Sequence, residues 1–290
     1  MQMRDFTIEN LTEIVHEEYV SKTSDPRLRE IMGSLVNHLH AFVKDIQLTE
    51  AEWFEAVQFL TATGQMCDEK RQEFILLSDT LGVSMLVDAI NHPRSGAGTE
   101  NTVLGPFYVS GAPDLPMGSN IVKKDSGGTL AFVRGKVTDQ DDNPIDGAVL
   151  DVWQASVRGF YDVQDPEVPQ WNLRGKFTTG PDGKYCLATE LPGFYPVPTD
   201  GPVGKMLNAC GRHAMRPGHL HFVITADGYD RLTTHIFTAG DEYLESDAVF
   251  ATKSSLVGEY QACEDEALAK EYGLQMPFQL LDFDFGLMRT

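Results

Sequence analysis

The chain has 290 residues, of which 42% are hydrophobic, and this is enough for one large domain or for a domain with a sizeable appendage. Its formal net charge of -20 repels phosphate backbones and anionic lipid headgroups, so nucleic acid is not an expected partner. The apolar stretches are shorter than the roughly 20 residues of a membrane span, and the N-terminus has no apolar core of a secretory signal. We therefore expect a cytoplasmic protein without a membrane span.

The first part of the chain, up to about Asn91, has the patterns of helices. Asp25 can cap a helix whose first residue is Pro26, and apolar residues then recur at spacings of three and four from Leu28 to Phe42. Thr49 and Glu52 match a capping box that begins a second helix. Between Phe74 and Ile90 the apolar residues cover almost every side of the helical wheel, which predicts a central helix or one at a subunit interface. We expect Asp79 to be the one buried acid of this run.

The segment from His92 to Gly98, which contains Pro and Gly, ends this pattern, and short strands separated by turn pairs follow it. We predict an α+β fold with a helical domain at 1–100 and a mainly antiparallel β-sandwich domain at 101–290. The predicted strands are Leu130–Thr138, Ala148–Gln154, Lys184–Thr189, His219–Thr225, Leu232–Thr238 and Gln279–Leu287.

His219 and His221 begin one of these strands, and residues two apart in a strand project from the same face. Two imidazoles can therefore converge on one metal ion, although the short motif also fits two unrelated polar residues. Arg216 adds a permanent positive charge beside the pair. Because neither a third histidine nor a cysteine lies nearby in register, an ordinary zinc site fits poorly, and further ligands would have to be oxygen atoms.

Two tyrosines, Tyr161 and Tyr195, each follow a Gly-Phe pair where a strand gives way to a loop. Tyr195 precedes Pro196, which restricts it to extended geometry and holds it rigidly. A single tyrosine of this kind is more often a packed aromatic residue, so the interpretation depends on the combination with the histidines.

The set GFY, GFYP and RPGHLH, placed in strands after a helical segment, resembles the intradiol catechol dioxygenase family over most of the chain. The resemblance implies one Fe(III) per subunit with Tyr161, Tyr195, His219 and His221 as ligands. Anionic oxygen suits a hard trivalent ion, and imidazole suits iron in general. It also implies that the substrate diol displaces Tyr195, which then accepts a proton, and that Arg216 stabilises negative charge on the ring.

Within that family, catechol enzymes typically carry Gln where this chain has His235, and the segment Leu232–Phe237 is similar to the hydroxyquinol branch. We therefore expect His235 to be a catalytic residue, benzene-1,2,4-triol to be the substrate and 3-hydroxy-cis,cis-muconate, or maleylacetate, to be the product. By the same resemblance Leu76 and Asp79 face the ring, and Asp79 can accept a hydrogen bond from the third hydroxyl. The remaining implied pocket residues are Val103, Leu104, Gly105, Pro106, Phe107, Val197 and Pro198.

The helical segment corresponds to the dimerisation region of this family, so the resemblance implies a homodimer, whose interface can also hold a phospholipid. Two other interpretations stay open at this point. One is a catechol 1,2-dioxygenase, which differs in substrate. The other is a metal-free β-sandwich binding module, which would leave the two tyrosines and two histidines unexplained.

Overall fold

The structure is a computed structural model that describes residues 5–69, 71–93, 96 and 98–290. It divides into two compact units, one up to Ala62 and one from Thr63 onward. The domain boundary that we predict at residue 100 remains a prediction, and Arg94, Ser95 and Ala97 of the predicted breaking segment lie outside the described residues. Within the described ranges, no helix has the length and apolar character needed to cross a membrane.

The first unit consists of α1 (Leu11–Lys22), α2 (Pro26–Asp45) and most of α3 (Glu50–Gln65). As predicted, the Asp25 side chain caps α2 by accepting a hydrogen bond from the Leu28 amide at 2.6 Å. The capping box of α3 is also confirmed, since the Thr49 amide donates to Glu52 at 2.9 Å and the Glu52 amide donates back to the Thr49 hydroxyl at 3.3 Å.

The helix predicted between Phe74 and Ile90 is two helices, α4 (Glu73–Thr80) and α5 (Val83–Asn91), so that prediction of one continuous helix was wrong. The chain breaks at Gly82, whose φ of 74° lies in the left-handed region that ends helices. Asp79 is buried near the end of α4, as predicted. Both helices belong to the second unit.

The described strands of the second unit form two larger sheets and one short two-stranded sheet. The first sheet contains β1 (Leu130–Thr138), β4 (Lys184–Glu190), β10 (Gln261–Cys263), β11 (Phe278–Asp282) and β12 (Phe285–Gly286). The second has the order β3 (Arg174–Thr178), β2 (Val149–Gln154), β7 (His219–Thr225), β8 (Leu232–Thr238) and β9 (Val257–Gly258). The short sheet pairs β5 (Tyr195–Pro196) with β6 (Met215–Arg216). Outside the sheets lie α6 (Pro202–Ala209), α7 (Glu266–Tyr272) and the 3-10 turns Leu244–Ser246 and Ser254–Leu256.

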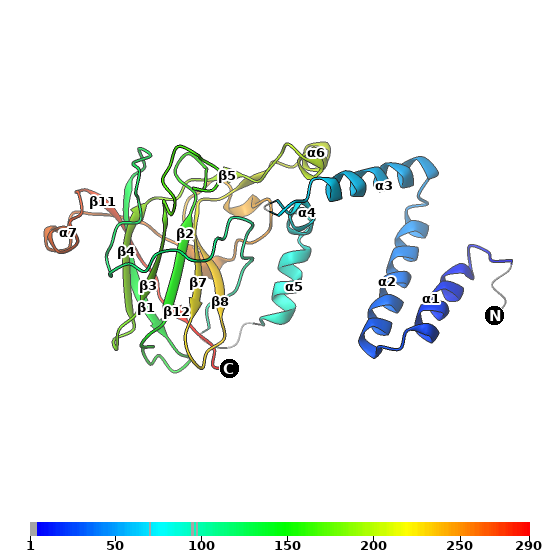
Figure 1. Ribbon diagram of the computed structural model, residues 1–290, viewed down its shortest axis with the longest axis horizontal. Helices are drawn as coiled ribbons and strands as arrows, with labels where there is room; N and C mark the ends of the chain where they lie inside the picture. The colour runs from blue at the N-terminus through cyan, green and yellow to red at the C-terminus, as the bar shows by residue number, and fades with distance from the viewer. Residues whose placement is uncertain (1–4, 70, 94–95, 97) are drawn as a thin grey trace. The chain divides into compact units, whose positions relative to one another are not determined.

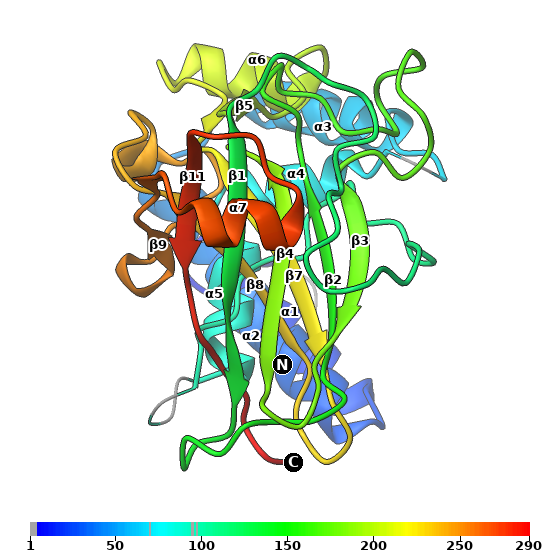
Figure 2. The same cartoon turned by 90° about the vertical axis from the view of Figure 1, so that its left-hand side faces the viewer.

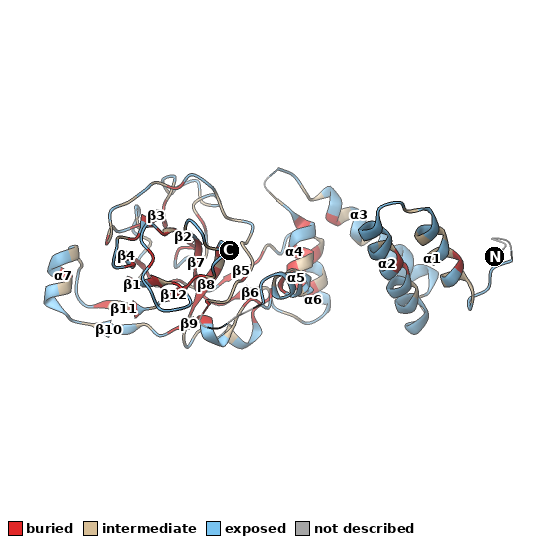
Figure 3. Cartoon of the chain, turned by 90° about the horizontal axis from the view of Figure 1, so that it is seen from below, coloured by how far each residue is buried: buried red, intermediate tan, exposed pale blue. Residues whose placement is uncertain are grey.

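The two larger sheets pack face to face and make the predicted sandwich (Figure 1, Figure 2). Its core joins Val133 and Leu187 of the first sheet to Leu150, Leu220 and Phe222 of the second, and all five are fully buried. Many of the buried residues lie in the strands, as the red segments of Figure 3 show. The pairing is mainly antiparallel, as predicted, but β1 pairs in parallel with β11 and β12, and β8 pairs in parallel with β9.

The predicted last strand is interrupted, because β11 ends at Asp282 and β12 begins at Phe285. At this interruption Gly135 of β1 faces the Phe283 carbonyl so closely that a Cβ atom would lie 1.8 Å from its oxygen. The Phe283 amide still donates to the Arg134 carbonyl at 2.9 Å. A side chain at position 135 would therefore separate β1 from the C-terminal segment.

We expect Gly135→Ala to lower the free energy of unfolding by on the order of 3 kcal/mol, because the obstructing atom is backbone and cannot rotate away. Gly180→Ala is the matched control, since nothing lies within 4 Å of its Cβ position. Urea unfolding followed by tryptophan fluorescence measures both. Equal midpoints for the two variants would contradict this account of the interrupted strand.

Candidate functional site

The site lies on the outer face of the second sheet, opposite the face that packs in the sandwich core. His219 and His221 of β7 point to this outer face, while Leu220 between them is fully buried in the core. The strand register places Trp153 of β2 opposite His221 on one side and His235 of β8 opposite it on the other. The Trp153 indole stacks on the His221 ring at 4.6 Å with an interplanar angle of 12°.

Both predicted tyrosines reach this face from outside the sheet. Tyr161 comes from the loop after β2, and Tyr195 lies in β5, where its backbone pairs with Arg216 of β6. This pairing gives Tyr195 the extended and fixed geometry expected of a residue before proline. The two side chains are 1% and 4% exposed.

Four donor atoms converge at the centre of the site. The Tyr161 Oη atom lies 2.8 Å from Tyr195 Oη and 2.6 Å from His221 Nε2. The His219 Nε2 atom lies 3.1 Å from His221 Nε2 and 3.5 Å from Tyr195 Oη. Donors that each lie roughly 2.0–2.2 Å from one ion are separated by such distances. Two phenolic oxygens and two imidazole nitrogens form a suitable set for a ferric ion.

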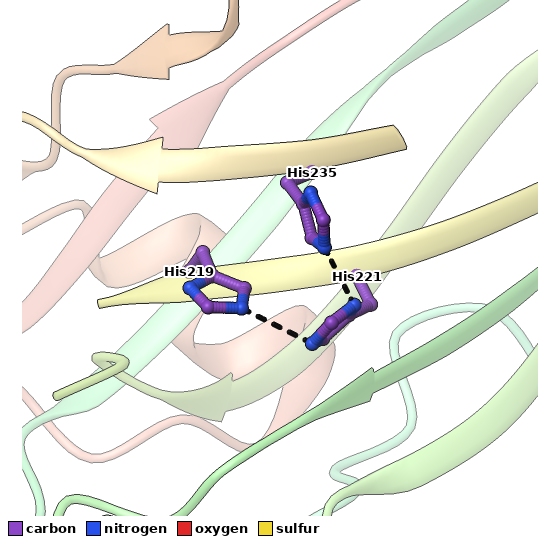
Figure 4. Close-up of side chains that lie close together, drawn as sticks. All are labelled: His219, His221 and His235. Atoms are coloured by element: carbon purple, nitrogen blue, oxygen red, sulfur yellow. Dashed lines mark hydrogen bonds between the residues drawn. The ribbon is translucent and has the colours of Figure 1, made fainter. Parts of the chain in front are cut away.

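The Nδ1 atoms of His219 and His221, which are not among the four converging donors, have hydrogen-bond partners of their own. His219 Nδ1 lies 2.6 Å from the Pro217 carbonyl, which fixes its proton there and leaves Nε2 as an acceptor. His221 Nδ1 lies 2.8 Å from His235 Nε2 (Figure 4), and His235 Nδ1 lies 2.5 Å from the Thr102 hydroxyl. His219, His221 and His235 lie close enough together to suggest a three-histidine metal site. However, both nitrogens of His235 are engaged behind His221, so the tyrosine oxygens complete the set better.

Burial controls protonation at the site. Burial, with the charge of Arg216 as the next cause, lowers the pKa of His219 to about 3. Burial also lowers the pKa of His221 and His235 well below the usual value, so all three rings are neutral near pH 7. It raises the pKa of Tyr161 well above 10 and raises that of Tyr195 as well. A cation that binds here therefore has to displace phenolic protons.

Arg216 is a buried cation beside His219, and the Asp247 carboxylate binds it. Its Nε donates to one Asp247 oxygen at 3.1 Å and Nη2 approaches the other at 3.4 Å, while Nη1 lies 3.3 Å from His219 Nε2. The same carboxylate accepts the Val249 and Ala251 amides. Burial is the largest single influence on the pKa of Asp247 and raises it, but the charge and hydrogen bonds of Arg216, with smaller contributions from His219 and the Val249 amide, together hold it below its usual value. We did not single out Asp247 from the sequence, because no pattern marks it.

A cavity of about 740 Å³ opens beside Tyr195 and Arg216. Its walls include most of the predicted pocket residues: Leu76, Asp79, Val103, Gly105, Pro106, Phe107, Val197 and Pro198. Leu104 is not among the lining residues and packs instead against the aromatic cluster of Trp153 and Tyr161. The wall also includes residues that the sequence analysis did not select: Glu69, Arg71, Gln72, Glu73, Ile75, Tyr108, Val109, Val163, Gln164 and Val249.

Asp79 is the acid in the apolar part of this wall. It is 6% exposed, and burial raises its pKa, while a hydrogen bond with Ser84 and the charge of Arg216 oppose the rise. A buried carboxyl of this kind is well suited to pair with a hydroxyl group that enters the cavity.

Comparisons with known proteins agree with this arrangement. The family model for the catechol dioxygenase N terminus matches residues 25–99, and the model described as dioxygenase matches residues 103–288. A hydroxyquinol 1,2-dioxygenase of Rhizobium sp. is 51% identical over 267 residues, covering 91% of this chain and 90% of the relative. An intradiol ring-cleavage dioxygenase of Aspergillus niger is 40% identical over 286 residues, covering 99% of this chain and 86% of the relative.

A solved structure extends the likeness to the fold. Hydroxyquinol 1,2-dioxygenase from Pseudomonas putida DLL-E4 superimposes with a TM-score of 0.91 at 49% identity, and the match covers 98% of this chain and 99% of that one. Identity of this level over nearly the whole length, together with both family models, establishes the family of the protein. The chain belongs to the intradiol ring-cleavage dioxygenase family.

Proposed function

We propose that the protein cleaves hydroxyquinol (benzene-1,2,4-triol) with dioxygen between the two adjacent hydroxyl-bearing carbons, giving 3-hydroxy-cis,cis-muconate, or maleylacetate. The observation that carries the proposal is the convergence of two phenolic oxygens and two imidazole nitrogens beside a cavity whose wall contains Asp79. The name and high identity of the Rhizobium and Pseudomonas relatives support the same substrate.

Tyr161, Tyr195, His219 and His221 would hold one ferric ion per subunit. When bound, ferric iron would supply Lewis acidity that withdraws electron density from the diol oxygens. His219 and His221 suit this role because both rings are neutral, so no proton has to leave them. His235 would act behind His221 and fix the orientation of its ring.

Three further side chains would act on the substrate itself. Tyr195 Oη would accept a proton from the diol, since it is the phenol of the pair that borders the cavity. Arg216 would stabilise negative charge on the ring, because Asp247 binds its Nε and Nη2 and leaves Nη1 directed toward the site. Asp79 would accept a hydrogen bond from the third hydroxyl.

The alternative substrate is catechol, which lacks the third hydroxyl and so would leave Asp79 without its partner. The other alternative, a metal-free binding module, does not agree with membership of an enzyme family. The cytoplasmic location remains a prediction.

We also propose a homodimer that forms through the helical segment. The predicted apolar stripe of α2 stays exposed in the single chain, with Leu28, Ile31, Leu35, Leu39 and Phe42 between 45% and 55% exposed. Side chains of this kind on one helix face favour burial against a second subunit. A phospholipid bound at that interface is part of the same proposal.

The first prediction concerns the metal. Purified protein kept anaerobic should contain one iron per subunit and be red-brown, because phenolate ligands transfer charge to Fe(III). Addition of hydroxyquinol should shift the visible band. A colourless protein that stays free of iron after reconstitution would contradict the proposed site.

The second prediction concerns substrate choice. Asp79→Leu should reduce the ratio of kcat/KM for hydroxyquinol to that for catechol by about tenfold or more, as expected for the loss of one hydrogen bond to a charged group. Asp79→Asn keeps the shape and an acceptor oxygen and should lose less of the preference. An unchanged ratio in Asp79→Leu would remove Asp79 from substrate recognition.

The third prediction concerns assembly. Sedimentation at micromolar concentration should give a dimer, and Leu35→Glu with Leu39→Glu should give a monomer, because two carboxylates cannot be buried unpaired in an apolar interface. Asn37→Glu places the same charge at an exposed polar position of α2 and should remain dimeric. A monomeric wild-type protein would overturn the proposed homodimer.

A further inference from the structure

One row of residues runs straight across the second sheet and extends beyond the proposed ligands. The register pairs His235 with His221, His221 with Trp153, and Trp153 with Arg174 of β3. Directly paired residues project from the same face of a sheet. Arg174 therefore occupies the end of the row opposite His235, on the face that carries the site.

Arg174 is buried and makes contacts with two separate segments of the site. Its Nε donates to Asp162, the residue after Tyr161, at 2.6 Å, and the two side chains are 4% or less exposed. Its Nη2 donates to the Phe107 carbonyl at 2.9 Å. The guanidinium carbon lies 5.9 Å from the centre of the Tyr161 ring. One cation thus joins the loop of Tyr161 to the cavity wall at Phe107.

These two segments also touch one another at the site. The Phe107 ring stacks on the Tyr161 ring with centroids 4.6 Å apart. Phe107 lines the cavity, while the Tyr161 Oη atom lies among the four converging donors. A shift of either segment would therefore move a proposed iron ligand relative to the wall against which the substrate ring would pack.

The backbone before Arg174 is held in a costly conformation. Trp171 and Leu173 have φ values of 64° and 59°, in the left-handed region that side chains disfavour. Several hydrogen bonds maintain it: the Trp171 amide donates to Asp162 at 3.0 Å, and the Asn172 side chain accepts the amides of Lys123 and Lys124. Such strain persists only where the surroundings enforce it.

A contribution to stability alone is a weak explanation of the buried Arg174–Asp162 ion pair. Burying an arginine and an aspartate has a desolvation cost that their attraction often fails to repay, so a buried ion pair is poor evidence of a contribution to stability. A planar guanidinium is, however, well suited to bond two partners in fixed directions. Asp162 and the Phe107 carbonyl accept hydrogen bonds from two of its nitrogen atoms, Nε and Nη2, in this way.

We propose that Arg174 is a positioning residue that holds Tyr161 and the Phe107 wall in register, and so determines how firmly the metal and the substrate ring are held. The inference rests on the proposed function and extends it to a residue that touches neither metal nor substrate. At one end of the row, His235 would orient His221 by a hydrogen bond. At the other end, Arg174 would orient Tyr161 by its bond to Asp162.

The test compares Arg174→Gln, Arg174→Lys and Asp162→Asn with the wild-type protein. The measurements are the visible spectrum, the rate of iron release to a chelator, the thermal midpoint of the iron-free protein, and KM and kcat for hydroxyquinol. In Arg174→Gln we expect iron release at least tenfold faster and kcat/KM at least tenfold lower, as for other residues that orient metal ligands. The visible band should move to longer wavelength, because loss of the cation raises the energy of the phenolate electrons.

Arg174→Lys should be intermediate, since an ammonium keeps the charge but cannot reproduce the two directed bonds. Arg289→Gln is a control for the loss of an arginine–aspartate pair outside the proposed site, since Arg289, although exposed, pairs with the buried Asp139. It should leave the spectrum and the iron release unchanged.

A folded Arg174→Gln protein would overturn the proposal if its visible band is unshifted and its iron release and kcat/KM both lie within twofold of the wild-type values. If Arg174→Gln does not fold, the same criteria apply to Arg174→Lys and Asp162→Asn. Failure of all three to fold would also overturn it, because the pair would then be a folding element. A wild-type protein that neither binds iron nor cleaves hydroxyquinol would instead refute the proposed function.

Discussion

The register of β3, β2, β7 and β8 is the constraint on which the site depends. Because paired residues share a face, this register alone aligns Trp153, His221 and His235. The two-residue period of a strand then places His219 beside His221 and directs Leu220 into the core. A shift of one residue would turn the core residue outward and both histidines inward. The hydrophobic core of the sandwich therefore fixes the position of the donor atoms.

Burial gives these donors their chemistry. The same low-polarity surroundings that keep the histidines neutral also keep the phenols protonated. Without a bound metal ion, the charged groups beside the four donor atoms are therefore Arg216 and its partner Asp247. A trivalent ion that displaces two phenolic protons would bring a net charge of one into the site, far less than its own three. The protein thus suits a hard cation by providing oxygen ligands that become anionic when the cation displaces their protons, in a place where water is scarce.

Much of this arrangement could be predicted from the sequence, because alternation and turn signals are local. Strands β1, β7 and β8 have the predicted limits, and the cavity wall contains most of the predicted residues. The misses have physical causes. Gly82 ends a helix whose apolar pattern continues past it, and Gly135 admits a backbone contact that interrupts the last strand; both effects depend on backbone geometry.

Strand β3 and Asp247 were missed for a related reason. The sequence Arg174-Gly-Lys-Phe-Thr178 places an arginine at a fully buried position, so it lacks the apolar alternation of a strand. Arg216 is also buried. Arg174 forms an ion pair with Asp162 and Arg216 forms one with Asp247, and both aspartates lie in segments without regular secondary structure.

Core positions normally exclude such charges, because their desolvation must be offset by directed contacts. Arg174 and Arg216, the buried arginines among the described residues, both flank the four converging donors. These two departures from the rules that build the fold therefore coincide with the proposed site, where the arginines would be held for chemistry instead of for packing.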